Sequence, residues 1–298
     1  MIRLDAASLL LQWAVGGMLF CWFTTRRREV GVGYGWLLRG TYLLMAVGAI
    51  FAGFAARVVA VREGVSIAVA ATCLLGLVVS NVRRKAGVSG QQAEHDRRSE
   101  RVAAMTGIER QGRSATTTTT ALESPGRAKE FPPWLDLLPA IVGVVGLVAA
   151  AIDSTRGHAN AHIAVAVARM IIGAAFLGSI TDAMLLGHWY LVQPGLPRRL
   201  LNELVSALGW IWPAEVIALL LPVGMISIFD GTIDDGWNGM LGWFWIACAL
   251  STIVLVFVTR AALRERYYSA VMAATGLLYL AILTAFGTDL VARAVLSG

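Results

Sequence analysis

The sequence contains little charge for its length. Only 15% of its 298 residues are Asp, Glu, Lys or Arg, whereas about a quarter is usual in a soluble globular domain. Hydrophobic residues make up 57% of the chain, and its mean hydropathy is +0.67. The apolar residues come in blocks of about 20, the length that a helix needs to cross a hydrocarbon core about 30 Å thick. The scarcity of charge therefore argues against a soluble domain.

Cysteine is also scarce, and its spacing indicates neither a disulfide framework nor a metal site. The three cysteines each lie within an apolar run and form no CxxC pair (Cys21, Cys73 and Cys248). Buried thiols of this kind usually serve as small core residues. The sequence also lacks a Ser-His-Asp grouping, an HExxH motif, a Walker loop and a CxxCH motif. No motif assigns an enzymatic reaction.

The apolar blocks predict an all-α fold, a polytopic integral membrane bundle of about eight helices. Lipid cannot satisfy backbone N–H and C=O groups, so each block should be a helix with its own internal hydrogen bonds. The first block has no small-x-small cleavage site after it and is interpreted as a retained span rather than a signal peptide. The predicted spans are roughly 7–24, 36–57, 65–82, 135–152, 161–192, 199–229, 240–259 and 268–294.

The net charge of +6 reflects basic residues at the ends of the apolar blocks. This placement is typical of membrane orientation, so we expect a lipid bilayer and no nucleic acid as partner. One set of alternating connections holds Arg26 to Arg28 with Arg39, then Arg83 to Lys85, Arg198 with Arg199, and Arg260 to Arg266. This set is predicted to be cytoplasmic, which places the N- and C-termini outside in a multi-pass protein of the cell membrane.

A long polar insertion divides the chain into three predicted parts. Residues 1–82 form a three-span part, 83–133 a mobile basic cytoplasmic linker, and 134–298 a five-span part. The linker includes "RRKAGVSGQQAEHDRRSE" and "TTTTT", and it has too few large apolar residues to offset the entropy of ordering. The loops of spans one to four and five to eight differ in length, and no internal repeat is expected.

Spans five and six carry ionisable residues where hydrocarbon is expected. They are Arg169, Asp182 and His188 with Tyr190 in span five, and Glu215 in span six. An ionisable side chain in the bilayer core costs at least a few kcal/mol and usually faces protein or water. These five residues are therefore candidates for a proton or quinone site. The alternative is structural: bonded or protonated carboxylates, a snorkelling Arg169 and an interfacial His188.

Three further features of this region bear on which of these candidate residues could act together. Asp182 and His188 are about 120° apart around one helix, so they are not expected to face one cavity. Pro213 and Pro222 free backbone carbonyls in span six. "HANAH" places His158 and His162 at the i, i+4 spacing that suits a metal ion on a helix, without a third ligand nearby in sequence.

These observations leave three functions open. The first is a membrane subunit of an electron-transfer complex linked to quinone, associated with other membrane or soluble subunits, with the polar groups bonding the quinone carbonyls. A bis-histidine haem is disfavoured as a cofactor, because His162 and His188 lie at opposite ends of one helix and cannot clamp one iron; a His/Met ligand pair stays open. The second is a proton-coupled secondary transporter in which Asp182 and Glu215 titrate. The third is a non-catalytic scaffold or assembly protein.

Overall fold

A computed structural model describes residues 5–86, 88, 130–155, 160–193, 195–265 and 267–296. Within these ranges the chain forms helices and no strands. Eight helices are long and apolar enough to cross a membrane, which confirms the predicted all-α polytopic bundle. They are α1 (Ala6–Thr25), α2 (Val32–Ala55), α3 (Ala60–Val82), α5 (Leu137–Ser154), α6 (Asn160–Val192), α7 (Arg199–Leu220), α8 (Met240–Ala262) and α9 (Tyr268–Leu296).

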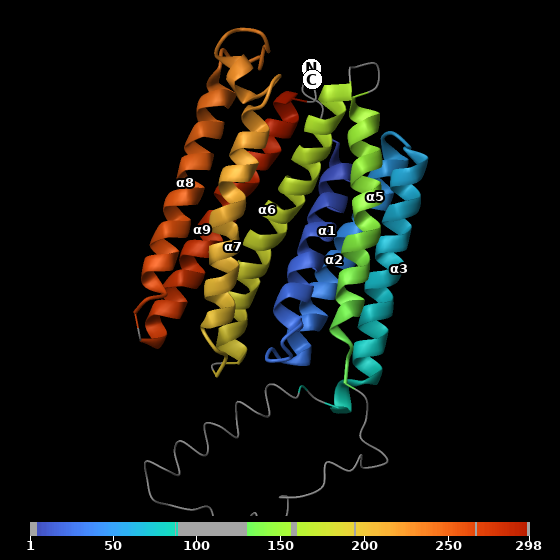
Figure 1. The fold of residues 1–298 in the computed structure, drawn as a ribbon, viewed down its shortest axis with the longest axis vertical. Helices are drawn as coiled ribbons and strands as arrows, with labels where there is room; N and C mark the ends of the chain where they lie inside the picture. The colour runs from blue at the N-terminus through green and yellow to red at the C-terminus, as the bar shows by residue number, and fades with distance from the viewer. Residues whose placement is uncertain are drawn as a thin grey trace, which may run out of the picture.

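The eight helices run along the long axis of the molecule and pack as two groups of four, which lie side by side (Figure 1). In the first group, α1 contacts α2, α2 contacts α3, α3 contacts α5, and α5 returns to α1. In the second group, α6, α7, α8 and α9 contact one another in the same order, and α9 returns to α6. The loop lengths predict no internal sequence repeat, yet the helices of both groups pack in the same order. The two groups meet mainly where α1 contacts α6.

Glycines bring α1 and α6 into backbone contact at this junction. A Cβ atom on Gly16 would lie 1.7 Å from the carbonyl oxygen of Ala174, and one on Gly178 would lie 2.2 Å from the carbonyl carbon of Gly16. Lipid provides no hydrophobic force between helices, so close packing of small residues is a main source of attraction between them. Gly16 and Gly178 therefore fix the junction between the two groups.

The predicted sixth span, 199–229, is too long. The helix α7 continues through Pro213 but ends at Leu220, because Pro222 has no N–H to donate and its ring clashes with the preceding turn. The rest of the predicted span contains the short 3-10 helix η3 (Met225–Ile228). The last turns of α9, which reaches Leu296, pack against η3.

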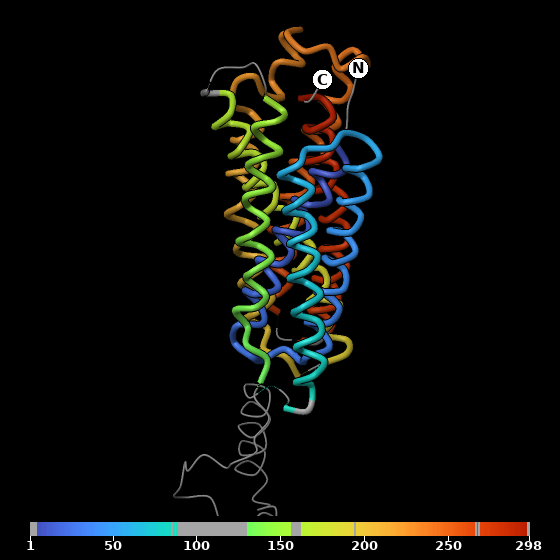
Figure 2. Tube along the Cα trace, turned by 90° about the vertical axis from the view of Figure 1, so that its right-hand side faces the viewer, coloured from blue at the N-terminus to red at the C-terminus, as the bar shows by residue number. Residues whose placement is uncertain are grey.

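α1 begins and α9 ends at the same end of the bundle (Figure 1), as an even number of spans requires. We call this the terminus end and the opposite end, to which residues 86 and 130 belong, the linker end. Figure 2 shows α3 and α5 in front, both running the length of the bundle. Most of the predicted linker lies outside the described residues. α5 packs on α3 and α1, so helices from both sides of the linker share one group.

Candidate functional site

The first of two buried polar clusters lies toward the linker end. This linker-side cluster consists of Thr25, Arg39, Tyr42, Asp136 and Asp182. The Arg39 guanidinium donates to both carboxylate oxygens of Asp136, with Nε–Oδ1 at 2.6 Å and Nη2–Oδ2 at 2.8 Å. The Thr25 hydroxyl donates to Oδ2 at 2.9 Å. Arg39 is 2% exposed and Asp136 is fully buried, so the pair is a bidentate ion bridge that joins α2 to the start of α5.

Asp182 occupies the deeper part of this cluster. The Tyr42 hydroxyl donates to its Oδ1 atom, and its Oδ2 atom has no hydrogen-bond partner among the described residues. Tyr42 reaches α6 across α1 because Gly17 has no side chain: a Cβ there would lie 1.9 Å from the tyrosine Cζ. Asp182 therefore faces α1 and α2.

The second cluster lies toward the terminus end, where α1, α6, α7 and α9 meet. This terminus-side cluster consists of Gln12, Arg169, Glu215, Asp289 and Arg293. Glu215 is fully buried, and neither of its carboxylate oxygens has a hydrogen-bond partner among the described residues. Asp289, Arg293 and Arg169 are close enough to interact with it electrostatically. A buried acid without a direct partner is costly in a membrane, so Glu215 is the most unusual group in the molecule.

The two arginines of the terminus-side cluster are held by other groups. Arg169 donates to three carbonyls at the end of α7, those of Ala218 at 3.0 Å, Leu221 at 3.0 Å and Val223 at 2.9 Å. These carbonyls belong to the last turn of α7 and to the segment after it, where the helix leaves them without intrahelical donors. Arg293 forms an ion pair of 2.7 Å with Asp289, which also accepts from Gln12 at 3.4 Å.

A tightly packed section separates the clusters. Gly173, which lies against Gln12 and Asp289, precedes Asp182 by nine residues on α6, a distance of about 14 Å along the axis. Between them lie the backbone contact at Gly178 and the fully buried side chains of Phe176, Leu177 and Ile180. The polar groups therefore occupy two depths of the junction. We call the section between them the apolar barrier, since its two buried hydroxyls, Ser179 and Thr181, donate to backbone carbonyls of α6.

The residues predicted for one site are dispersed. Asp182 belongs to the linker-side cluster, and Glu215 with Arg169 to the terminus-side cluster. His188 is exposed and lies edge-on to Tyr279, with ring centroids 6.4 Å apart. The Tyr190 hydroxyl donates to the Pro197 carbonyl at 2.7 Å.

The pair of histidines proposed for a metal is only partly described. His162 lies at the terminus end of α6, and His158 lies outside the described residues. Within the described ranges, no three His, Cys, Asp or Glu side chains come together as metal ligands would.

The sequence does not identify several members of the clusters as site residues. Arg39 was counted with a basic connection, whereas it lies within α2; its isolation in "WLLRGTYLL" was the available signal. Asp289 and Arg293 are four residues apart on α9, a spacing that suits an ion pair on one helix face, and they form one. Gln12 and Tyr42 carried no signal, because a single amide or phenol in an apolar run does not indicate which helix it faces.

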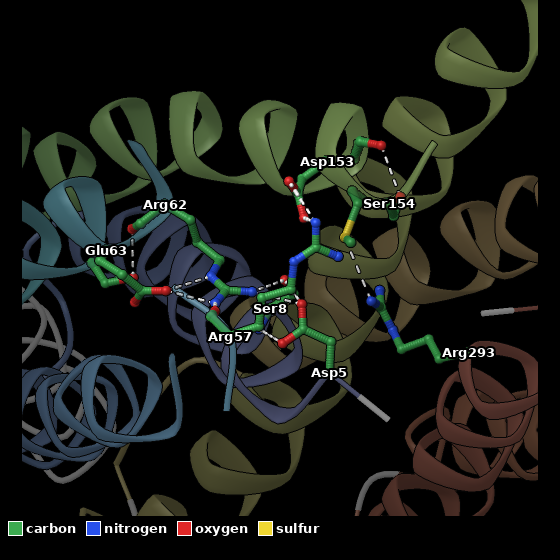
Figure 3. A network of polar contacts seen from close by, with 11 residues as sticks. Asp5, Ser8, Arg57, Arg62, Glu63, Asp153, Ser154 and Arg293 are labelled. Atoms are coloured by element: carbon green, nitrogen blue, oxygen red, sulfur yellow. Dashed lines mark hydrogen bonds and ion pairs between the residues drawn. The ribbon is translucent and has the colours of Figure 1, made fainter. Parts of the chain in front are cut away.

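A separate ion-pair network fastens the terminus end (Figure 3). Arg62 donates to Glu63 at 2.6 Å and to Asp5, the N-cap of α1, at 2.6 Å. Arg57 forms a pair of 3.3 Å with Asp153 at the end of α5. Figure 3 shows the labelled side chains of Asp5, Arg57, Arg62, Glu63 and Asp153 lying close to one another. The network ties α1, α3 and α5 together.

The acidic loop before α8 is also structural. The Asp235 carboxylate accepts from the N–H groups of Gly239 at 2.9 Å, Trp237 at 2.9 Å and Leu241 at 3.0 Å. These bonds, that of Gly239 first, hold the pKa of Asp235 below its usual value. Bonding to Thr232 likewise lowers the pKa of Asp230. Both acids shape the loop.

Comparison of the chain with protein-family models, curated proteins and solved structures finds no match in any of the three.

Proposed function

We propose that this multi-pass membrane protein is a secondary transporter that couples the movement of a solute to protons. The observation that carries the proposal is Glu215, fully buried and without a hydrogen bond to either carboxylate oxygen among the described residues. An ionisable residue within a membrane span faces protein or water and often belongs to a proton path. A group that takes up and releases a proton needs an oxygen that no permanent donor occupies.

The packing of the helices supports transport. Parallel repeats, with sites near the bilayer midplane at the contact between them, are common in secondary transporters. Here two groups of four helices pack in the same order, and each polar cluster includes residues of both groups: Tyr42 bonds Asp182 in one, and Gln12 bonds Asp289 in the other. Asp182 offers a second acceptor, the Oδ2 atom, on the other side of the apolar barrier. Protons would be exchanged from each end without an open pore.

A quinone-linked role is the second candidate, and His188 is the observation that favours it. Its ring is exposed near the linker end and lies edge-on to Tyr279, an arrangement that a quinone carbonyl could approach from lipid. The other predicted quinone ligands do not join it: the Tyr190 hydroxyl is bonded to a backbone carbonyl, and Asp182 faces Tyr42. Organic extraction and an absorption spectrum of the purified protein test this candidate. Bound quinone or a haem band would favour electron transfer over transport.

Proton movement in proteoliposomes tests the first candidate. Vesicles containing a trapped pH dye receive amino acids, organic acids, amines or sugars from outside. The wild type should move protons with at least one of these classes, whereas Glu215→Gln, which keeps the size but cannot titrate, should not. Trp210→Phe serves as a control because Trp210 is 79% exposed and lies away from both clusters. Absence of coupled movement for every class, or full movement in Glu215→Gln, would reject the proposal.

A further inference from the structure

We infer that a pocket at the linker end is the aqueous entrance through which Asp182 exchanges its proton. The inference rests on the proposed function, since it assigns the route to one of the two buried acids. It adds a site that the sequence did not indicate, together with its ligand, which is water.

The pocket lies at the start of α2, beside the segment that leads into α5. It has a volume of about 40 Å³, and a water needs about 10–15 Å³ of such space, so it has room for roughly two or three waters. Its polar lining favours water: Arg28, Glu130, Arg39 and Thr25 contribute to the wall. Phe131 forms an apolar side, 4.0 Å from the Arg39 guanidinium to the ring centroid.

Polar groups continue from the pocket toward Asp182. Arg39 and Thr25, both in the wall, bond the buried Asp136 carboxylate. Tyr42 follows Arg39 by three residues on α2, so both lie on one face of the helix, about 4.5 Å apart along its axis. The Tyr42 hydroxyl then donates to Asp182. On the terminus side of Asp182, α6 carries the buried apolar side chains of Phe176, Leu177 and Ile180.

The chemistry of the exchange is a simple proton transfer. A hydronium ion in the pocket passes its proton inward to the Tyr42 hydroxyl and is left as water, and the hydroxyl gives its own proton to the Oδ1 atom of Asp182, to which it is already bonded. The reverse step returns the proton to water. The titratable groups around Asp182 are Tyr42 and Tyr34 on α2, Cys21 on α1, and Asp136 at the start of α5.

Blocking the pocket tests the inference. Val32 is an apolar residue of the pocket wall, and Val32→Cys allows a cationic thiol reagent to fill the pocket from the linker side. Hydrogen–deuterium exchange at the Tyr42–Asp182 pair is followed by infrared spectroscopy, with bands assigned from Tyr42→Phe and Asp182→Asn. Modification should slow this exchange by about tenfold or more, because a path without water loses its hydrogen-bonded continuity. If Val32→Cys does not accumulate, Gly31→Cys replaces it, because Gly31 belongs to the same pocket wall.

Arg26→Cys is the matched control. Arg26 is exposed at the same end but is not part of the pocket wall, so modification there should leave the exchange unchanged. The wild type, whose three cysteines are buried, reports any background reaction. Unchanged exchange after modification of Val32→Cys, equal slowing in Arg26→Cys, or failure of Val32→Cys to react would each overturn the inference.

The experiment separates the inference from the proposed function. Exchange is measured without a solute and does not require transport. Exchange that depends on the pocket, in a protein that moves no protons with any solute, would keep the entrance and reject transport. Coupled proton movement, in a protein whose exchange is unchanged when the pocket is blocked, would keep transport and reject the entrance.

Discussion

The linker-side and terminus-side clusters contain the same kinds of residue but bond them differently. In the linker-side cluster, Arg39 and Asp136 form a direct bidentate pair. In the terminus-side cluster, Arg169 bonds to backbone carbonyls while Glu215 has no hydrogen bond among the described residues. Each cluster contains one direct ion pair, Arg39–Asp136 and Arg293–Asp289. The terminus-side cluster differs because it also holds Glu215, an acid without a hydrogen bond among the described residues.

This difference indicates different roles. A bidentate pair with both charges buried fixes the position of α5 against α2, and breaking it would be expensive. Glu215 can gain or lose a proton without breaking any hydrogen bond of the described residues. Asp182 is intermediate, because Tyr42 bonds one of its oxygens, while the other has no partner within the described part of the chain. The ion pair is architecture, and the two acids are the candidates for function.

The largest effect should come from breaking the ion pair. Arg39→Met leaves Asp136 charged and buried, and should lower the free energy of unfolding in detergent by about 3–5 kcal/mol. Arg57→Ala is the control: it removes an ion pair whose arginine side chain is 66% exposed, which should change stability by about 0–1 kcal/mol. Arg39→Met combined with Asp136→Leu should regain most of the loss. Equal effects of the two single variants would contradict the role of Arg39 as an anchor.

A smaller loss of stability is expected from a substitution that pushes α1 and α6 apart at their glycine contact. Gly16→Ala places a methyl group 1.7 Å from the Ala174 carbonyl oxygen, which should cost about 1–3 kcal/mol or more through overpacking. Gly276→Ala is the matched change, since nothing lies within 4 Å of its Cβ position, and it should be neutral or slightly stabilising. Thermal unfolding of the two variants in the same detergent provides the comparison. A junction that tolerates Gly16→Ala as well as Gly276→Ala would not be tightly packed.

The two acids should respond differently to leucine. Asp182→Leu leaves the Tyr42 hydroxyl buried without its acceptor, which should cost about 1–3 kcal/mol. Glu215→Leu leaves no hydrogen-bonded partner behind and should change the free energy of unfolding by less than about 1 kcal/mol. Combining Asp182→Leu with Tyr42→Phe should recover part of the loss. If Glu215→Leu is the more damaging change, Glu215 has a structural partner and is not a free acid.

The smallest effect concerns the loop before α8, which must be distinguished from the terminus-side cluster in any pH titration. Bonding to backbone N–H groups keeps the pKa of Asp235 below its usual value, about 3.9 in an unfolded chain. Its stabilisation is therefore complete above pH 4 or so and is lost as the pH falls through the lower folded pKa. Fluorescence of the exposed Trp237 should report loosening of the loop at acidic pH. Asp235→Asn should abolish that transition, and an unchanged transition would assign it to another group.

The sequence predicted the architecture well because block length and hydropathy depend on the bilayer alone. The error at span six came from Pro222, which ends α7 although apolar residues continue. The candidate site was only partly predictable, since ionisable residues in apolar runs are visible but their partners are not. Tyr42 reaches Asp182 only because Gly17 leaves room, and Asp136 meets Arg39 across 97 residues. Such contacts depend on which helices are neighbours, as does the repeated packing order.

The central claim is that Asp182 and Glu215 take up and release protons on opposite sides of the apolar barrier. Charge displacement on a solid-supported membrane after a pH jump tests this claim directly, without knowledge of the solute. The wild type should give a transient current, Asp182→Asn and Glu215→Gln should each reduce it, and the double variant should abolish it. A current that persists unchanged in the double variant would contradict the claim.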